Sequence, residues 1–176
     1  AALTPEMKLT VKAVKKAVRF LKKQNAKKIN GYYYGIVHPD CSYDLTEDAR
    51  WIDAVKYKNP ERIYNGEIGE IEGARFVETT EAKIWAKAGA AKSTSDTTKI
   101  DVYGTLIFGA NAYATTKIEG GGLKTIIKQL GSAGTGDPLD QRATVGWKAL
   151  KVTEILTEAY MIRIETASTF SDGEAN

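Results

Sequence analysis

His38 and Cys41 are the residues whose types most directly suggest covalent chemistry, and they lie in the sequence HPDC with Asp40 between them. A thiolate beside an imidazole becomes a nucleophile when separate elements hold the two side chains together and a third group orients the imidazole. Here both residues fall within a single turn. We therefore predict a turn histidine and a semi-buried cysteine, and we assign no catalytic residue to this segment.

Two groups of glutamates could supply the paired carboxylates of acid–base catalysis, namely Glu67, Glu70 and Glu72, and Glu78 with Glu81. A glycosidase pair requires two environments that push the pKa values of the two carboxyl groups apart across a cleft. Close spacing within one glycine-containing segment provides no such difference. We predict that these glutamates are solvated charges of strands and turns.

Cofactor and metal sites are not predicted either. The glycine-rich stretches 120–122 and 131–136 lack the GxxxxGK[ST] pattern, and neither places GxGxxG at the start of a helix after a parallel strand. A zinc site would have to combine the single cysteine and the single histidine with scattered carboxylates. The predicted chemistry is therefore that of a protein without catalytic, cofactor-binding or metal-binding residues.

Cations are concentrated in the N-terminal part of the chain, where no acidic residue separates Lys8 from Lys28. Such a basic rod could neutralise phosphates and release counterions, or it could be an ordinary solvated helix face. The side chains predicted to face DNA under the first interpretation are Lys12, Lys15, Lys16, Arg19, Lys22 and Lys23.

One long helix is expected to carry these cations, from Thr4 to Ile29. Thr4, Pro5 and Glu6 have the residue types of a helix start, and Asn30 with Gly31 supplies residues that readily adopt the left-handed conformation after a helix. An apolar stripe at steps of three and four residues should pack against the rest of the protein through Met7, Val11, Val14, Val18 and Leu21.

The remaining pattern indicates an α+β protein with a mostly antiparallel sheet. A helix capped by Asp44 or Thr46 should follow a strand that ends at His38 and Pro39. Residues 123–130 fit a helix and a strand equally well. The other extended segments are expected at 31–37, 74–80, 82–86, 100–108, 143–152 and 159–166, with the last two pairing with each other and a polar loop at 88–98.

Length and composition place the chain among ordinary globular proteins. Its 176 residues suit one domain, or one compact domain with a lobe. No apolar run approaches the roughly 18 residues needed to span a bilayer, so we expect no membrane partner. The first residues lack the pattern of a secretory signal and do not include an initiator methionine, so we expect a processed or truncated product.

Four separated stretches together resemble the major capsid proteins of tailed bacteriophages and prophages. They are YYYGIVHPDCSYDLTEDARWIDAVKY, GEIGEIEGARFVETTEA, DVYGTLIFGANAYATTKI and SAGTGDPLDQRATVGWKALKVTEILTEAYMIRIE. The resemblance implies the tailed-phage capsid fold, shared with encapsulins, in which a peripheral domain with a long spine helix beside a sheet adjoins an axial domain. It also implies that the N-terminal arm and the extended loop of that family are absent from this chain.

The resemblance further implies a domain division and a function. Residues 1–37 would form the spine helix and first strand of the peripheral domain, residues 38–118 the axial domain, and residues 119–176 the return to the peripheral domain. The protein would be a non-enzymatic head protein that assembles through pentamers or hexamers into an icosahedral virion shell, and it would lie in the bacterial host cytoplasm during assembly. Packaged double-stranded DNA would be a further partner, and a DNA-binding or packaging-associated protein is the alternative.

Tryptophans are the side chains most enriched at the centres of protein interfaces, although most tryptophans serve in a core. The candidates for anchors between subunits are Trp51, Trp85 and Trp147.

Overall fold

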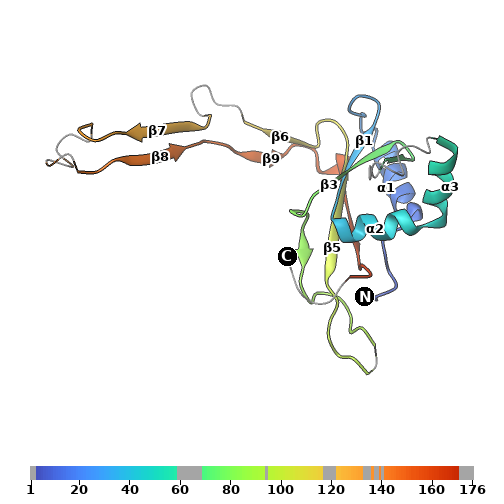
Figure 1. The fold of residues 1–176 in the computed structure, drawn as a ribbon. Helices are drawn as coiled ribbons and strands as arrows, with labels where there is room; N and C mark the ends of the chain where they lie inside the picture. The colour runs from blue at the N-terminus through green and yellow to red at the C-terminus, as the bar shows by residue number, and fades with distance from the viewer. Residues whose placement is uncertain are drawn as a thin grey trace. The chain divides into compact units, whose positions relative to one another are not determined.

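A computed structural model describes residues 3–58, 69–93, 95–116, 122–132, 136, 139 and 141–170, with side chains described outside 54–58. The chain divides into two compact units (Figure 1). The main unit contains Ala1–Ala112 and Thr157–Asn176, and the second unit contains Tyr113–Leu156. Among the described residues no helix is both long enough and apolar enough to cross a membrane.

A six-stranded mixed sheet forms the centre of the main unit, in the order β10-β5-β1-β3-β2, with β4 also paired to β5. β1 and β3 run parallel, and the other neighbours are antiparallel. The α+β class and the mostly antiparallel sheet are therefore confirmed. The strands are β1 (Tyr33–Val37), β2 (Glu70–Ile71), β3 (Ala74–Glu78), β4 (Ile84–Trp85), β5 (Val102–Phe108) and β10 (Met161–Thr166).

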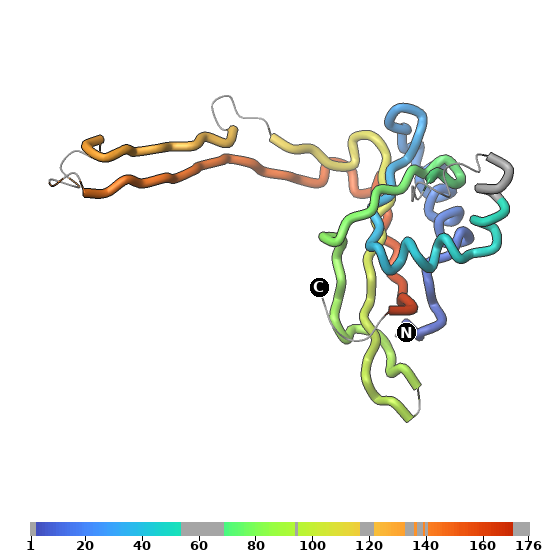
Figure 2. The backbone as a smooth tube through the Cα atoms, viewed as in Figure 1, coloured from blue at the N-terminus to red at the C-terminus, as the bar shows by residue number. Residues whose placement is uncertain are grey.

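The two ends of the described chain lie side by side in the main unit (Figure 2). Lys8 and Ala167 form a parallel bridge, and the amide of Ala167 donates to the carbonyl of Met7 at 2.9 Å. The loop expected at 88–98 is also present, with a bridge between Ala91 and Lys99 (Figure 2). Its described residues are exposed except for Gly89, which is buried, and Ala90, which is half-buried.

The second unit consists of two antiparallel strand pairs. β6 (Tyr113–Thr115) pairs with β9 (Thr153–Ile155), and β7 (Lys124–Lys128) pairs with β8 (Thr144–Lys148). The ambiguous segment at 123–130 is thus a strand, because a neighbouring strand satisfies its backbone groups. The expected pairing of 143–152 with 159–166 is wrong. The former contains β8 and the latter contains β10, which pairs with β5 in the main unit.

Helix α1 spans Val11–Lys23, so the long helix expected from Thr4 to Ile29 is wrong in its bounds. The Thr4–Pro5 segment forms a turn, in which the amide of Met7 donates to the carbonyl of Thr4. The helix begins after Thr10, whose hydroxyl accepts from the amide of Ala13 at 3.3 Å. Thr10 therefore supplies the N-cap that sequence reasoning assigned to Thr4.

The end of α1 is set by Asn25 rather than by Asn30 and Gly31. Asn25 has a φ of 57°, and the amide of Ala26 then donates back to the carbonyl of Leu21 at 3.0 Å. This left-handed residue closes the last turn. Asn30 and Gly31, with φ of 50° and 88°, form the tight turn that leads into β1.

Two helices, α2 (Pro39–Glu47) and α3 (Ala49–Lys58), stand where one helix capped by Asp44 or Thr46 was expected. The first begins earlier because His38 caps it and Pro39 occupies its first turn. Asp48 separates the two helices. Its Oδ1 accepts from the amide of Arg50 at 3.0 Å, and its Oδ2 accepts from the amide of Val11 at 3.0 Å, so one carboxylate serves the first turns of α3 and α1.

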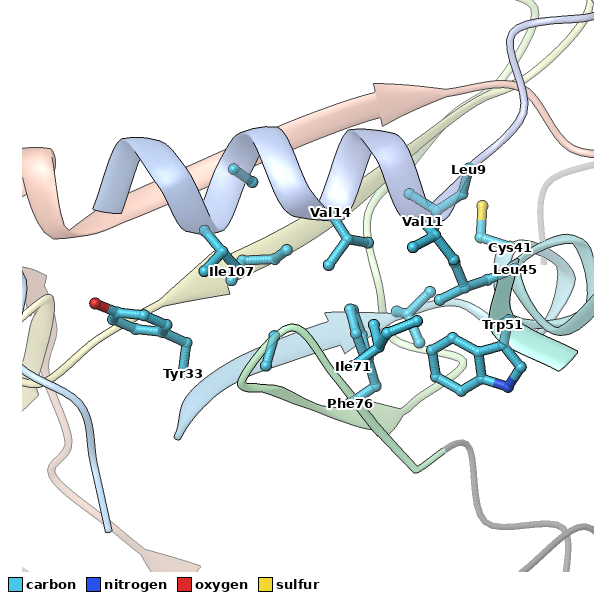
Figure 3. Packing of buried hydrophobic residues seen from close by; sticks show 14 of the residues in the cluster. Leu9, Val11, Val14, Tyr33, Cys41, Leu45, Trp51, Ile71, Phe76 and Ile107 are labelled. Carbon is cyan, nitrogen blue, oxygen red and sulfur yellow. The ribbon is translucent and has the colours of Figure 1, made fainter. Parts of the chain in front are cut away.

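The core lies between α1, α2, α3 and one face of the sheet (Figure 3). Four members of the predicted helix stripe are buried, together with Ala17, whereas Met7 is half exposed and lies outside the helix. Alternation along β1 buries Tyr33, whose hydroxyl donates to the carbonyl of Ala26 at 2.9 Å. The buried stripe of α1 is Val11, Val14, Ala17, Val18 and Leu21.

Candidate interaction surfaces

The His38 segment is a buried helix cap. The Nδ1 atom of His38 accepts from the amide of Asp40 at 3.2 Å and lies 3.4 Å from Asp40 Oδ2. The imidazole ring also packs on Tyr103, with ring centroids 5.2 Å apart. Nδ1 therefore serves the first turn of α2, as expected for a turn histidine.

Cys41 is buried against β10, where its Sγ lies 3.6 Å from the hydroxyl of Thr166. Burial raises the pKa of the Cys41 thiol to about 12. The thiol is therefore protonated near neutral pH, whereas nucleophilic attack and metal ligation both require the thiolate. The environment of Cys41 is that of an inert structural cysteine.

Two of the glutamates considered for acid–base chemistry have structural partners. Glu72 pairs with Lys15 at 3.2 Å, and Glu78 accepts from the hydroxyl of Ser42 at 2.8 Å. Glu67 lies outside the described residues. Within the described part of the chain, no group of three or more histidine, cysteine, aspartate or glutamate side chains could hold a metal ion.

A buried carboxylate that sequence reasoning took for a helix cap instead anchors the C-terminal segment. Asp44 accepts from the amide of Thr169 at 3.0 Å and from the Thr169 hydroxyl, and it lies 3.8 Å from the ammonium of Lys8. The sequence separation of these partners hides this role, because only the fold brings them to α2.

The six cations predicted to face DNA all lie on the exposed side of α1. Lys15 pairs with Glu72, and the others extend from the first turn of the helix to its last. The two cations in the last turn, Lys22 and Lys23, also favour the negative end of the helix dipole. The solvated face is therefore established, whereas contact with DNA stays a prediction.

The three tryptophans occupy different environments. Trp51 is buried and packs edge-on against Phe76, with ring centroids 6.3 Å apart. Trp85 is half-buried on the sheet, where the guanidinium of Arg163 lies 5.0 Å from its ring and a Cβ at Gly104 would approach it to 2.9 Å. Trp147 in β8 is 74% exposed. Exposure thus favours Trp147 as the predicted anchor between subunits.

The pair β7–β8 is a ribbon with two different faces. Its register sets Thr125 opposite Trp147 and Ile127 opposite Val145 on one face, which we call the apolar face of the ribbon. Lys124 lies opposite Lys148 on the other face, which we call the lysine face. A shallow hollow on the ribbon is lined by Leu123, Thr125, Val145, Gly146 and Trp147.

A family model described as phage capsid protein matches residues 2–130, which is well over half of the chain. The chain belongs to this phage capsid protein family. No curated protein sequence matches it.

Solved capsid structures resemble this capsid chain in fold. The capsid of Ralstonia phage GP4 has a TM-score of 0.65 at 14% identity, covering 99% of this chain and 50% of that one. The capsid of cyanophage P-SCSP1u has a TM-score of 0.61 at 16% identity, covering 90% and 46%. The acid-stable capsid of Helicobacter pylori bacteriophage KHP30 has a TM-score of 0.62 at 12% identity, covering 95% and 61%. The capsid chain thus spans about half the length of these similar chains.

Proposed function

We propose that this capsid chain forms part of the wall of a tailed-phage head and acts by binding copies of its own protein. The family match over residues 2–130 carries this proposal, and the likeness to three capsid folds supports it. The chain spans 46% to 61% of those proteins, so we propose the closed shell for the whole protein. The protein would be located in the virion, after assembly in the cytoplasm of a bacterial host.

The proposed mechanism is burial of complementary surface around symmetry axes. A shell subunit meets several neighbours at once, so modest individual contacts combine into a stable lattice. Pentamers and hexamers are the proposed assembly intermediates. Each subunit would divide at 37/38 and 118/119 into a peripheral domain, formed by residues 1–37 and 119–176, and an axial domain, formed by residues 38–118. The second unit exposes large apolar side chains that suit such contacts, among them Leu123, Ile127, Val145, Trp147, Leu150 and Leu156.

We propose no enzymatic activity for this protein. The capsid family indicates a structural role. Cys41 and His38, whose residue types could supply a nucleophile and a base, have other roles in this structure. His38 Nδ1 accepts a backbone hydrogen bond, and the high pKa of Cys41 keeps its thiol protonated.

Packaged double-stranded DNA is the proposed second partner, contacted through the exposed cations of α1. A face of this kind would neutralise phosphates without reading base sequence. The alternative of a DNA-binding or packaging-associated protein has weaker support, because the family and the three similar structures are all described as capsids.

Light scattering after size-exclusion chromatography, combined with electron microscopy, tests the proposal. The purified chain should form small oligomers whose size rises with concentration, and antibodies raised against it should label intact phage heads. A chain that is confined to tails or to the infected cytoplasm, and is missing from purified heads, would contradict the shell function.

A further inference from the structure

The ribbon β7–β8 leaves one apolar face without a covering element in the described structure. Leu123 and Trp147 are each 74% exposed, Val145 is 75% exposed and Ile127 is 64% exposed. The first three line the same shallow hollow, and the register places Ile127 directly opposite Val145. A contiguous apolar surface of this kind marks an interaction site.

The opposite face of the ribbon cannot play the same role. Lys124 and Lys148 are directly opposite each other, and Lys128 lies on the same face. Like charges at a cross-strand pair repel and are best kept in water. The ribbon therefore has one side suited to burial and one side suited to solvent.

Burial of the apolar face is also a requirement of stability. Two strands alone are marginally stable in water, and independent stability needs a third strand or a packed hydrophobic face. The ladder from Lys124 to Lys128 contains one strand pair, and its exposed side chains gain nothing from the hydrophobic effect while they remain in water. An element that covers the apolar face would stabilise the ribbon and create an interface in one step.

We infer that a second copy of this chain covers the apolar face, so that two ribbons pack face to face in a small four-stranded sandwich. This inference rests on the proposed self-association of the capsid protein. Face-to-face packing brings both apolar faces inside at the usual spacing of about 10 Å and leaves both lysine faces in water. The Trp147 ring of each copy can enter the hollow beside Val145 of the other, which is the self-complementarity that a twofold contact needs.

The exposed apolar area agrees with a dimer contact. A tryptophan buries about 150–250 Å² and is flanked here by three more exposed apolar side chains, and each contributes twice in a twofold contact. This reaches the range of about 1,000 Å² in total that specific interfaces require.

Two adjacent isoleucines provide a matched test by sedimentation equilibrium of the 176-residue chain, from low micromolar to several hundred micromolar. Ile127 lies on the apolar face and Ile126 on the lysine face. Ile127→Thr and Ile126→Thr make the same chemical change and keep a β-branched residue in the strand. Ile127→Thr should weaken dimerisation by about tenfold or more, because a twofold contact loses the buried side chain twice, and Ile126→Thr should leave it close to wild type. Equal effects of the two substitutions would overturn the inference.

Cross-linking gives a second readout that does not depend on changed affinity. Cys41 is completely buried, so a cysteine introduced in β8 is the reactive one under native conditions. A short bis-maleimide should cross-link Val145→Cys on the apolar face to a covalent dimer, and it should leave Thr144→Cys on the lysine face monomeric. Oligomers that form without this face preference would overturn the ribbon contact and leave the capsid function standing. A chain that stays monomeric at every concentration would also overturn it, whereas the labelling of phage heads would still decide the function.

Discussion

The hydroxyl of Tyr103 donates a hydrogen bond to Asp40 Oδ2 at 2.8 Å and so joins β5 to the first turn of α2. Tyr103→Phe keeps the ring against His38 and removes only this bond. We expect the free energy of unfolding to fall by about 1–3 kcal/mol, because the acceptor is a carboxylate that then loses a partner. Urea denaturation measures the change, and Tyr43→Phe on the exposed side of α2 serves as the control. Equal effects of the two substitutions would contradict a stabilising role for the Tyr103 bond.

Stability should decrease at alkaline pH. Burial raises the pKa of Tyr103 above its ordinary value of 10.0 and that of Cys41 from 9.0 to about 12. Both groups have higher pKa values in the folded protein than in the unfolded chain, so the unfolded chain releases these protons first as the pH rises. Stability is therefore unchanged below the pKa values of the unfolded chain and falls above them. The free energy of unfolding should thus be flat from about pH 7 to 9 and then fall, with Cys41 contributing at most about 1.4 kcal/mol per pH unit up to its folded pKa. Cys41→Ala should reduce the slope between about pH 9 and 12, and an unchanged slope would refute the assignment.

Asp48 should stabilise two helices at once. Asp48→Ala removes acceptors from the amides of Val11 and Arg50, and we expect a loss of about 1–3 kcal/mol. Asp48→Asn keeps one side-chain oxygen and should recover part of that loss. Denaturant titration followed by circular dichroism measures both variants, with Asp53→Ala on the exposed side of α3 as a control. If Asp48→Ala and Asp53→Ala changed the free energy of unfolding equally, the cap that Asp48 provides to the two helices would not contribute to stability.

Thr105 offers a substitution that should stabilise the protein. Its side chain is 1% exposed, and its hydroxyl has no hydrogen-bond partner among the described residues. Thr105→Val removes a buried polar group at nearly constant shape and should raise the free energy of unfolding by about 1 kcal/mol. Thr166→Val on the neighbouring strand is the matched control, because that hydroxyl lies 3.6 Å from Cys41 Sγ. Thermal unfolding should rank Thr105→Val above both wild type and Thr166→Val.

The exposed face of α1 predicts salt-dependent binding to double-stranded DNA. Replacing Lys12, Lys16 and Arg19 by glutamine should weaken binding to any sequence and reduce the slope of log K against log salt by about one for each phosphate that is no longer neutralised. Replacing Lys83, Lys92 and Lys99 removes the same charge elsewhere in the main unit and should change the slope less. Fluorescence anisotropy over a salt series measures both, and equal slopes would reject α1 as the DNA-binding surface.

Local patterns predicted the faces of elements better than their ends. The spacing of Val11, Val14, Val18 and Leu21 correctly identified the buried side of α1. The bounds failed because Thr4 and Thr10 are both acceptable caps, and because Asn25 and Asn30 can both adopt the left-handed conformation. Tertiary contacts select between such equal local choices, and the bond from Val11 to Asp48 is one of them.

Strand pairing was the least predictable property. Residues 143–152 and 159–166 both looked like strands, but the first pairs through β8 with β7 and the second pairs through β10 with β5, far away in sequence. Periodicity reports which face of a strand is buried and carries no information on the neighbour. The apolar face of the ribbon escaped notice for the same reason, because it exists only when Thr125 and Trp147 are opposite each other.

The position of β10 has a consequence for synthesis on the ribosome. β10 pairs with β5 along Met161–Thr166, yet the whole of Tyr113–Leu156 is translated between them. Until β10 emerges, one edge of β5 is unpaired in the nascent chain, and an unpaired strand edge can form hydrogen bonds with another chain. The native sheet can therefore form only after the ribosome has translated β10. Chaperones that shield β5 during that delay should raise the yield of native protein.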